Sequence, residues 1–289
     1  MGLRLKFNLA MLAACAIGFV VAAALLDPVL IGNAREEVLQ NARIMMAAAN
    51  AIRTYTSTEI EPLITPEHEG NFVPQTVPSY AAQKNFKAIQ AAFAGYSYRE
   101  PALNPTNLAD RAQDWEADII EGFRNGSATE KVIDRDTPNG PTVYLARPLV
   151  VRDSACLSCH SSPSAAPASM TRVYGLVNGF GWKMNETVGA QILSIPITEP
   201  LRLARNGYRA FLEVALGVLA VIVLSLNVLL HYLVIAPIKR VSRMADAVSL
   251  GESNVETYIK PGKDEVSSLS VSFDRMRQSL DQAMEMLKS

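Results

Sequence analysis

The chain has 289 residues, of which 49% are hydrophobic and 19% are charged, and its formal net charge is −1. Soluble globular domains usually carry about 25% charged residues, so the apolar excess must be concentrated in part of the chain. The balanced charge excludes a basic surface for nucleic acid, and the 3 cysteines are too few for a disulfide scaffold. The high hydrophobic content excludes a mainly disordered protein.

Two long apolar stretches, residues 7–26 and 214–236, account for this excess, and neither contains a charged residue. At about 1.5 Å of rise per residue, a helix over either stretch would cross the roughly 30 Å of hydrocarbon in a bilayer. We therefore predict two transmembrane helices. The predicted division of the chain is an N-terminus (1–6), a first transmembrane helix (7–31), an intervening domain (32–209), a second transmembrane helix (210–236) and a C-terminal tail (237–289).

Basic residues near these stretches indicate the topology. Arg4 and Lys6 precede the first stretch, and three basic residues between 239 and 243 follow the second. The positive-inside rule then places both termini in the cytoplasm, although three arginines between 202 and 209 weaken the asymmetry. The alternative for the first stretch is a cleaved signal peptide with small residues at 22–24. Its apolar run exceeds the roughly 7–15 residues usual in such peptides, so we expect it to be retained.

The intervening domain begins with helical patterns and ends with strands. Apolar residues recur at three- and four-residue steps from Asn33 to about Pro62, and the first transmembrane helix is expected to continue into this helix. Helices before strands predict an α+β domain. The layout resembles periplasmic PAS-like sensor domains, in which a long N-terminal helix packs beside an antiparallel sheet. The other expected elements are helices over Ser79–Ala94 and Asn107–Arg124, strands over Lys131–Asp134, Thr142–Val151 and Val188–Ile197, and a turn at Pro138-Asn139-Gly140.

The most informative motif is Cys156-Leu157-Ser158-Cys159-His160, a C-x-x-C-H run. This spacing is the attachment signature of c-type haem, in which two thiols form thioethers with the vinyl groups and the adjacent histidine binds the iron. We predict one covalent haem c, attached to Cys156 and Cys159, with His160 as the proximal iron ligand. Bacteria attach such haem outside the cytoplasmic membrane. This agrees with a two-pass protein of the inner membrane whose haem domain lies in the periplasm.

Two other readings of the motif are a thioredoxin-like redox pair and half of a zinc site. A zinc site needs further ligands. Between the two apolar stretches the sequence offers only His68 besides His160, and no further cysteine. A redox pair usually follows a strand and opens a helix of a thioredoxin fold, which the surrounding pattern does not resemble.

Several short motifs accompany the C-x-x-C-H run. They are the run from Asn41 to Leu63, Val77-Pro78, Tyr98-Arg99-Glu100, Leu103–Asn107 (LNPTN), Ala146-Arg147-Pro148, Tyr174-Gly175 and Gly179–Lys183 (GFGWK). Together they resemble the bacterial PAS-like c-type haem domain family, long described as a domain of unknown function, over about residues 35–198. The resemblance implies a haem-binding sensor fold with the same roles for Cys156, Cys159 and His160. Arg147 would either pair with a haem propionate or lie in solvent.

The sixth ligand of the iron stays open at this stage. Some relatives of the family use a cysteine opposite the histidine, but the only other cysteine of this chain, Cys15, lies in the first apolar stretch. Met46 or Met45 is the candidate, because both lie on the long helix that a PAS-like layout brings near the haem, and thioethers ligate haem in cytochromes c. The alternatives are core packing for both residues, ligation by Met170, Met184 or the loop residue His68, and a vacant or water-filled position.

The C-terminal tail has the sequence features of a membrane-proximal linker. Pro237 follows the second apolar stretch, Gly251-Glu252 ends a first amphipathic helix, and Asp264-Glu265-Val266 opens a second helix. Apolar residues from Leu269 to Met284 recur at heptad-like spacing. These marks resemble the HAMP family, whose units are parallel four-helix bundles made by two chains, so the resemblance implies a homodimer. The alternative is two amphipathic helices on the membrane surface.

These features favour a membrane-anchored haem sensor, responding to redox state or to a small gas. It would signal through HAMP to a separate cytoplasmic partner, because no kinase, cyclase or methyl-accepting sequence follows. The alternative is a membrane-tethered monohaem cytochrome that passes electrons to a redox partner, alone or within a larger complex. We expect no enzyme activity, since no Ser-His-Asp set or carboxylate pair can be assigned, and no binding to nucleic acid.

Overall fold

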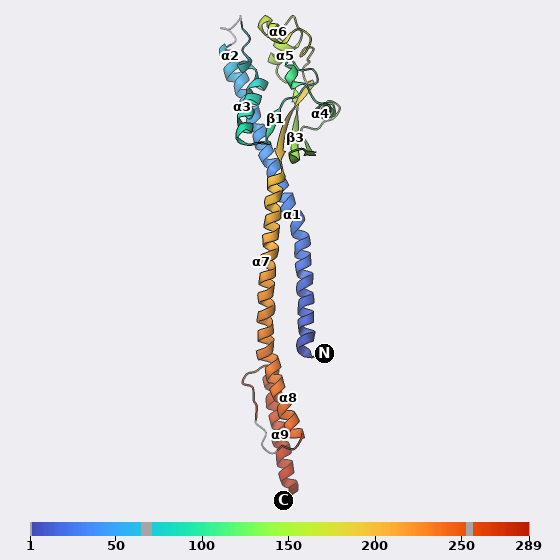
Figure 1. The fold of residues 1–289 in the computed structure, drawn as a ribbon, viewed down its shortest axis with the longest axis vertical. Helices are drawn as coiled ribbons and strands as arrows, with labels where there is room; N and C mark the ends of the chain where they lie inside the picture. Colours follow the sequence, from blue (N-terminus) through green and yellow to red (C-terminus); the bar gives the residue numbers. More distant parts are fainter. Residues whose placement is uncertain (1, 65–70, 253–256, 289) are drawn as a thin grey trace. The chain divides into compact units, whose positions relative to one another are not determined.

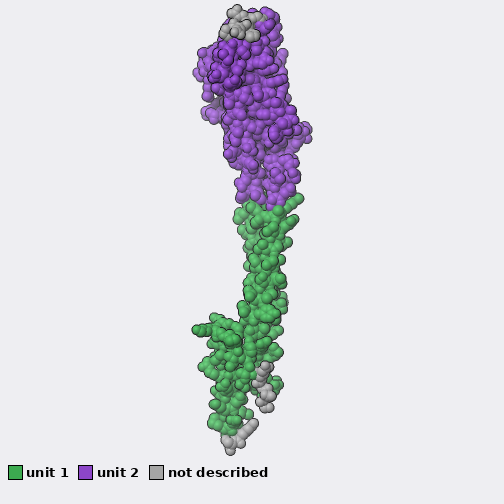
Figure 2. Space-filling view, turned by 90° about the vertical axis from the view of Figure 1, so that its left-hand side faces the viewer, with its two compact units in different colours: residues 1–27, 208–289 green, residues 28–207 purple. Residues whose placement is uncertain are grey.

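The computed structural model describes residues 2–64, 71–252 and 257–288. The chain divides into two compact units, residues 28–207 and residues 1–27 together with 208–289 (Figure 2). The unit formed by residues 28–207 combines helices with one four-stranded sheet (Figure 1). This confirms the predicted α+β class.

The sheet has the strand order β1-β4-β3-β2, and each neighbouring pair is antiparallel. β2 and β3 form a hairpin across the predicted turn, where Gly140 has a φ of 103°, a conformation that costs glycine no steric clash. The three expected strands are present with small shifts at their ends, whereas the short β1 was not predicted. The strands are β1 (Ser97–Arg99), β2 (Lys131–Thr137), β3 (Gly140–Val150) and β4 (Thr187–Pro196).

The long helix predicted before the sheet is part of a longer one. α1 runs from Leu3 to Tyr55 and continues through a π turn over Thr56–Ile60 into α2 (Glu61–Ile64). The expected continuation of the first apolar stretch into this helix is therefore confirmed. The other helices of the unit are α3 (Pro78–Ala92), α4 (Asp114–Arg124), α5 (Ala155–His160) and α6 (Ala168–Tyr174).

The start of α4 differs from the prediction, which began this helix at Asn107. The Asn107 side chain accepts a hydrogen bond from the Ala109 N–H at 3.1 Å, but it caps only a short 3-10 turn. α4 begins at Asp114, where the Glu116 carboxylate accepts a hydrogen bond from the Gln113 N–H at 2.8 Å. Asparagine caps turns and helices alike, so the residue type did not distinguish them.

Two apolar cores lie on opposite faces of the sheet. α1 and α3 pack on one face, and α4 packs on the other. Successive strand residues point to opposite faces, so Leu145 and Leu193 belong to the core under α1, while Ala146 and Ile192 belong to the core under α4. The core under α1 also contains Met46, which has no exposed surface.

The other unit contains apolar helices and the C-terminal tail. Among the described residues, two helical segments, Arg4–Ile64 and Thr198–Ser249, are long and apolar enough to cross a membrane. The second comprises α7 (Thr198–Leu230), a π turn over His231–Ile235 and α8 (Ala236–Ser249).

The π turn and the last helices complete this unit. Pro237 cannot donate a backbone hydrogen bond, which accounts for the wider turn just before it. The tail ends in α9 (Glu265–Lys288), which pairs with α8. The buried residues of α8 are Pro237, Val241 and Met244.

Candidate functional site

The C-x-x-C-H motif forms a short helix, α5, after the last residues of β3. The Asp153 carboxylate begins the helix by accepting a hydrogen bond from the Ala155 N–H at 2.9 Å, and the Asp153 carbonyl accepts one from the Cys156 N–H at 3.2 Å. Residues three or four apart lie on the same face of a helix, so Cys156 is brought beside Cys159 and His160. Both cysteines are free thiols and half-buried.

Burial dominates the electrostatics of the first thiol. It raises the pKa of Cys156, the nearby Asp153 carboxylate raises it further, and the Arg53 guanidinium opposes both. Arg53 lies on α1, so the end of that helix is close enough to α5 for its charge to act on the thiol. The thiol therefore stays protonated at neutral pH.

The His160 ring is held in one tautomer. Its Nδ1 lies 2.7 Å from the carbonyl oxygen of Gly179 and 3.3 Å from the Thr106 hydroxyl. A carbonyl only accepts hydrogen bonds, so Nδ1 must carry the proton, and the neutral ring keeps its lone pair on Nε2. Burial lowers the pKa of His160, which favours this neutral form, while the contact with Gly179 opposes the shift. Metal-binding histidines are usually oriented in the same way, by a hydrogen bond from the other ring nitrogen.

The GFGWK segment packs against the C-terminal end of α5. The Trp182 ring stacks on the His160 ring at 3.9 Å between centroids, with 11° between the planes. The Trp182 N–H donates to the His160 carbonyl at 3.2 Å, and the Gly181 N–H donates to the Ser161 carbonyl at 3.1 Å. These two bonds satisfy carbonyl groups that the end of a helix leaves unpaired.

Gly179 explains why the LNPTN and GFGWK motifs occur together. It has a φ of 84°, and a Cβ at this position would lie 2.0 Å from the Thr106 Oγ1 and 2.8 Å from the Thr106 Cα. Only a residue without a side chain lets the two segments approach so closely. The structure thus brings together Thr106, His160, Gly179 and Trp182, which come from three separate sequence motifs. We call these four residues the histidine cradle.

The candidates for a sixth iron ligand lie in different surroundings. Met46 is completely buried in the core under α1, and Met45 packs partly against the same core. Met170 is buried on α6, whereas Met184 is 44% exposed. His68 lies outside the residues that the structure describes.

Arg147, which the sequence offered as a propionate partner, is engaged elsewhere. Its Nε and Nη2 donate to one oxygen of Glu130 at 3.1 and 2.8 Å, and Arg43 donates to the other oxygen at 3.1 Å. Burial raises the pKa of Glu130, but the hydrogen bonds and charges of Arg147 and Arg43 outweigh it, so the pKa is lowered. Arg147 therefore serves the packing of β3.

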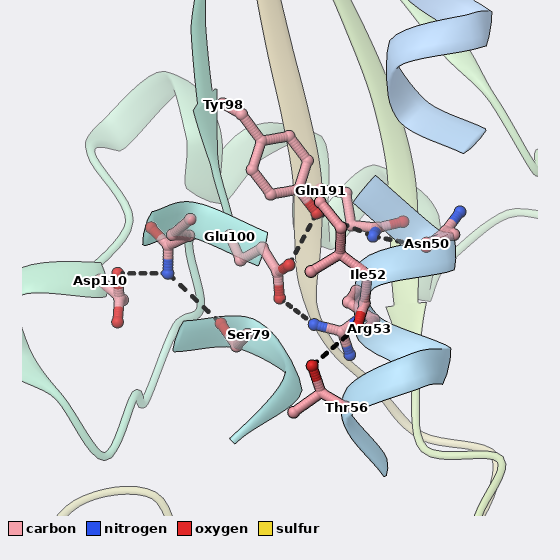
Figure 3. Close-up of polar contacts among 10 residues, drawn as sticks. Asn50, Ile52, Arg53, Thr56, Ser79, Tyr98, Glu100, Asp110 and Gln191 are labelled. Atoms are coloured by element: carbon pink, nitrogen blue, oxygen red, sulfur yellow. Dashed lines mark hydrogen bonds and ion pairs between the residues drawn. The ribbon is translucent and has the colours of Figure 1, made fainter. Parts of the chain in front are cut away.

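Sequence reasoning missed a buried polar network between α1 and the sheet (Figure 3). Arg53 forms an ion pair with Glu100, whose other oxygen accepts a hydrogen bond from the Tyr98 hydroxyl at 2.6 Å. Gln191 Nε2 donates to the Tyr98 oxygen at 2.9 Å and to Asn50 Oδ1 at 2.8 Å. Burial raises the pKa of Tyr98, and Glu100 raises it further. The signals available were the Tyr98-Arg99-Glu100 motif itself and polar residues at positions where the helix and strand patterns expect apolar ones.

Comparisons with known proteins identify two families in this chain. The model of the Tll0287-like family, described as Tll0287, matches residues 32–196, and that of the HAMP domain matches residues 229–282. A solved structure, described as the crystal structure of the cyanobacterial heme-protein Tll0287, is similar at 17% identity with a TM-score of 0.44. That match covers 55% of this chain and 95% of that one. No curated protein matches the chain.

Proposed function

Because the chain belongs to the Tll0287-like family and carries a HAMP domain, we propose that it is a membrane-anchored sensor built on one covalent haem c. The observation that carries this proposal is the histidine cradle, which holds His160 with Nε2 available to a metal. Two half-buried free thiols lie on the same short helix. The donor set fits a c-type haem, and the name of the solved relative supports haem as the group bound.

Each residue of the site has a proposed role. Cys156 and Cys159 attach the haem through thioethers, and His160 binds the iron. When bound, the haem supplies an iron that changes oxidation state or binds a small gas. The histidine cradle fixes the imidazole plane and the protonated Nδ1, so that the ring meets the iron with little loss of side-chain entropy. Met46 or Met45 would supply a further ligand to the iron.

The HAMP match supports a signalling role over simple electron transfer. HAMP domains commonly signal as dimers next to a membrane, so we propose a homodimer with two membrane spans per chain. In this topology the haem domain lies in the periplasm and both termini in the cytoplasm. The signal would pass to a separate cytoplasmic partner, and the protein itself would catalyse no reaction. A membrane-tethered cytochrome with a redox partner is the second candidate.

Covalent attachment is tested by the haem content of the full chain after denaturation. We expect the wild type to retain its haem in acid acetone and to give the pyridine haemochrome of two thioether links. Cys156→Ala and Cys159→Ala should each lose one link, while Cys15→Ala is the matched control and should lose none. Haem that acid acetone extracts from the wild type would show that the assignment is wrong.

Iron ligation is tested separately with His160→Ala. This variant should keep its thioethers, but the absorption spectrum should change to that of a haem without the proximal histidine. Carbon monoxide added to the reduced wild type then separates a gas sensor from a cytochrome with two protein ligands. A gas sensor binds it readily, whereas an electron-transfer cytochrome with two strong protein ligands does not.

The dimer is tested on α9, where apolar side chains are exposed within one chain. Leu269 is 50% exposed and Met276 is 59% exposed. In a Cys15→Ala background, Leu269→Cys or Met276→Cys should crosslink two chains on oxidation in membranes. Gln278→Cys, about two and a half helical turns from Leu269 and so on the opposite face of α9, is the control and should crosslink less. Equal crosslinking at all three positions would contradict a HAMP-type dimer.

A further inference from the structure

The polar network of Figure 3 contains a charged pair that is largely removed from water. The Glu100 side chain is 1% exposed and the Arg53 side chain is 24% exposed. Bringing two charges into a protein costs free energy that a single contact rarely repays. A pair of this kind is therefore weak evidence for stability. Its role is better indicated by the structural elements that it joins.

The pair lies between two elements that lead toward the candidate membrane spans. Arg53 and Asn50 lie on α1, which contains the first apolar stretch. Glu100 is joined through Tyr98 to Gln191 on β4, and β4 is followed directly by α7, which contains the second apolar stretch. One connected set of side chains thus joins both elements.

The same pair is connected through the chain to the candidate haem site. Glu100 begins the segment that ends at Thr106, and Thr106 contacts the His160 ring at 3.3 Å. This segment is fixed to the sheet, because the Ala190 N–H donates to the Pro101 carbonyl at 2.9 Å.

The ends of α1 and α5 also lie close to one another. The Asp153 carboxylate, which begins α5, adds to burial in raising the pKa of Glu61. Glu61 is the first residue of α2, the helix that continues α1. The charge of Arg53 likewise acts on the Cys156 thiol. Within the described part of the chain, Glu100 is the ion-pair partner that the structure gives Arg53, whereas Arg147 donates to Glu130 with two nitrogens.

We propose that the Arg53–Glu100 pair is the electrostatic link between the charge of the haem iron and the elements α1 and β4. The inference rests on the proposed function, since it needs a haem attached at Cys156 and Cys159. When ferric haem takes one electron from an external one-electron reductant, the iron centre loses one positive charge. Repulsion of Arg53 and attraction of Glu100 then both weaken. The electrostatic energy of the Arg53–Glu100 pair therefore changes. The pair is linked to α1 through Asn50 and to β4 through Gln191.

If the pair is this link, removing the charge of Arg53 and removing the charge of Glu100 should shift the reduction potential of the haem in opposite directions. In the haem-loaded full chain, Arg53→Met should favour the ferric form by about tenfold, which is about 59 mV lower in potential for one electron. Glu100→Gln should shift the equilibrium by a similar factor in the other direction. Arg53→Lys keeps the charge and should stay near the wild type. Arg147→Met removes an arginine of the Glu130 pair and is the matched control for a general charge effect.

A second readout follows the two structural elements. Hydrogen exchange at residues 50–56 and 191–195 should differ between the ferric and ferrous wild type, and this difference should disappear in Glu100→Gln. The haemochrome of each variant shows whether haem is attached. Attached haem with an unchanged potential in both Arg53→Met and Glu100→Gln overturns the link and leaves the proposed function standing. A wild type without covalent haem overturns both.

Discussion

The two candidate iron ligands, His160 and Met46, lie in the same unit but in opposite kinds of surroundings. His160 is held by main-chain groups, one hydroxyl and a stacked ring. Met46 is held by apolar side chains from α1, α3 and the sheet, and it has no exposed surface. The same chain therefore contains a polar site with one free ring nitrogen and an apolar site with an enclosed sulfur.

The comparison shows what prepares a residue for metal binding. The hydrogen bond from His160 to Gly179 places the proton on Nδ1 and directs the lone pair of Nε2 away from Gly179. A buried methionine has no such constraint, because it fills space and its sulfur accepts only weak hydrogen bonds. The burial of Met46 favours its role as a packing residue, and the first prediction tests this.

The largest effect is expected at Met46. Replacing this fully buried side chain by alanine leaves a cavity in the core under α1, and such changes cost about 2–5 kcal/mol of unfolding free energy. Met46→Leu keeps the volume and should cost less than about 1.5 kcal/mol. The measurement is urea denaturation of the full chain in detergent, followed by tryptophan fluorescence.

Met46→Leu also tests whether Met46 is an iron ligand. If Met46 only packs, Met46→Leu leaves the near-infrared sulfur-to-iron band of the oxidised protein as it is in the wild type. A band present in the wild type and absent from Met46→Leu would establish Met46 as the sixth ligand. Met45→Leu tests the other candidate in the same way, and Met45 packs only partly against the core.

A smaller effect is expected at Gly179 of the histidine cradle. An L-residue in the left-handed region costs about 1–2 kcal/mol, and in Gly179→Ala the Cβ would also overlap the Thr106 Oγ1 at 2.0 Å. We expect a loss of about 3 kcal/mol and a changed haem spectrum, since the carbonyl that orients His160 belongs to this residue.

Gly181→Ala is the control for the backbone effect alone. Gly181 has nearly the same φ, 83°, and nothing within 4 Å of its Cβ position. Gly181→Ala should lose only the unfolding free energy that the left-handed backbone costs, and it should keep the haem spectrum of the wild type. Equal losses in the two variants would show that contact with Thr106 does not shape the cradle.

More of the fold than of this site could be predicted from the sequence. The spacing of apolar residues predicted α1, α3 and three strands, because one face of each packs on a core. The cradle was not predicted because its contacts use backbone groups of Gly179 and Trp182 and join segments more than fifty residues apart, such as Thr106 and His160. The motif spacing named Cys156, Cys159 and His160, but no local pattern shows which residue orients the ring.

The smallest effect is expected at Trp182, which stacks on His160. Trp182→Phe keeps an aromatic face and the backbone hydrogen bond to the His160 carbonyl, so it should retain most of the contact. Trp182→Leu keeps the backbone bond but removes the stacking, which is worth about 0.5–1.5 kcal/mol. Both variants leave the hydrogen bond from His160 to Gly179 in place, so thioether attachment and the ferrous spectrum should stay close to the wild type. Thermal unfolding followed by far-ultraviolet circular dichroism measures the loss without depending on tryptophan fluorescence. A loss of iron ligation in Trp182→Leu that equals the loss in Gly179→Ala would show that the stacked ring, and not the main chain, holds the histidine.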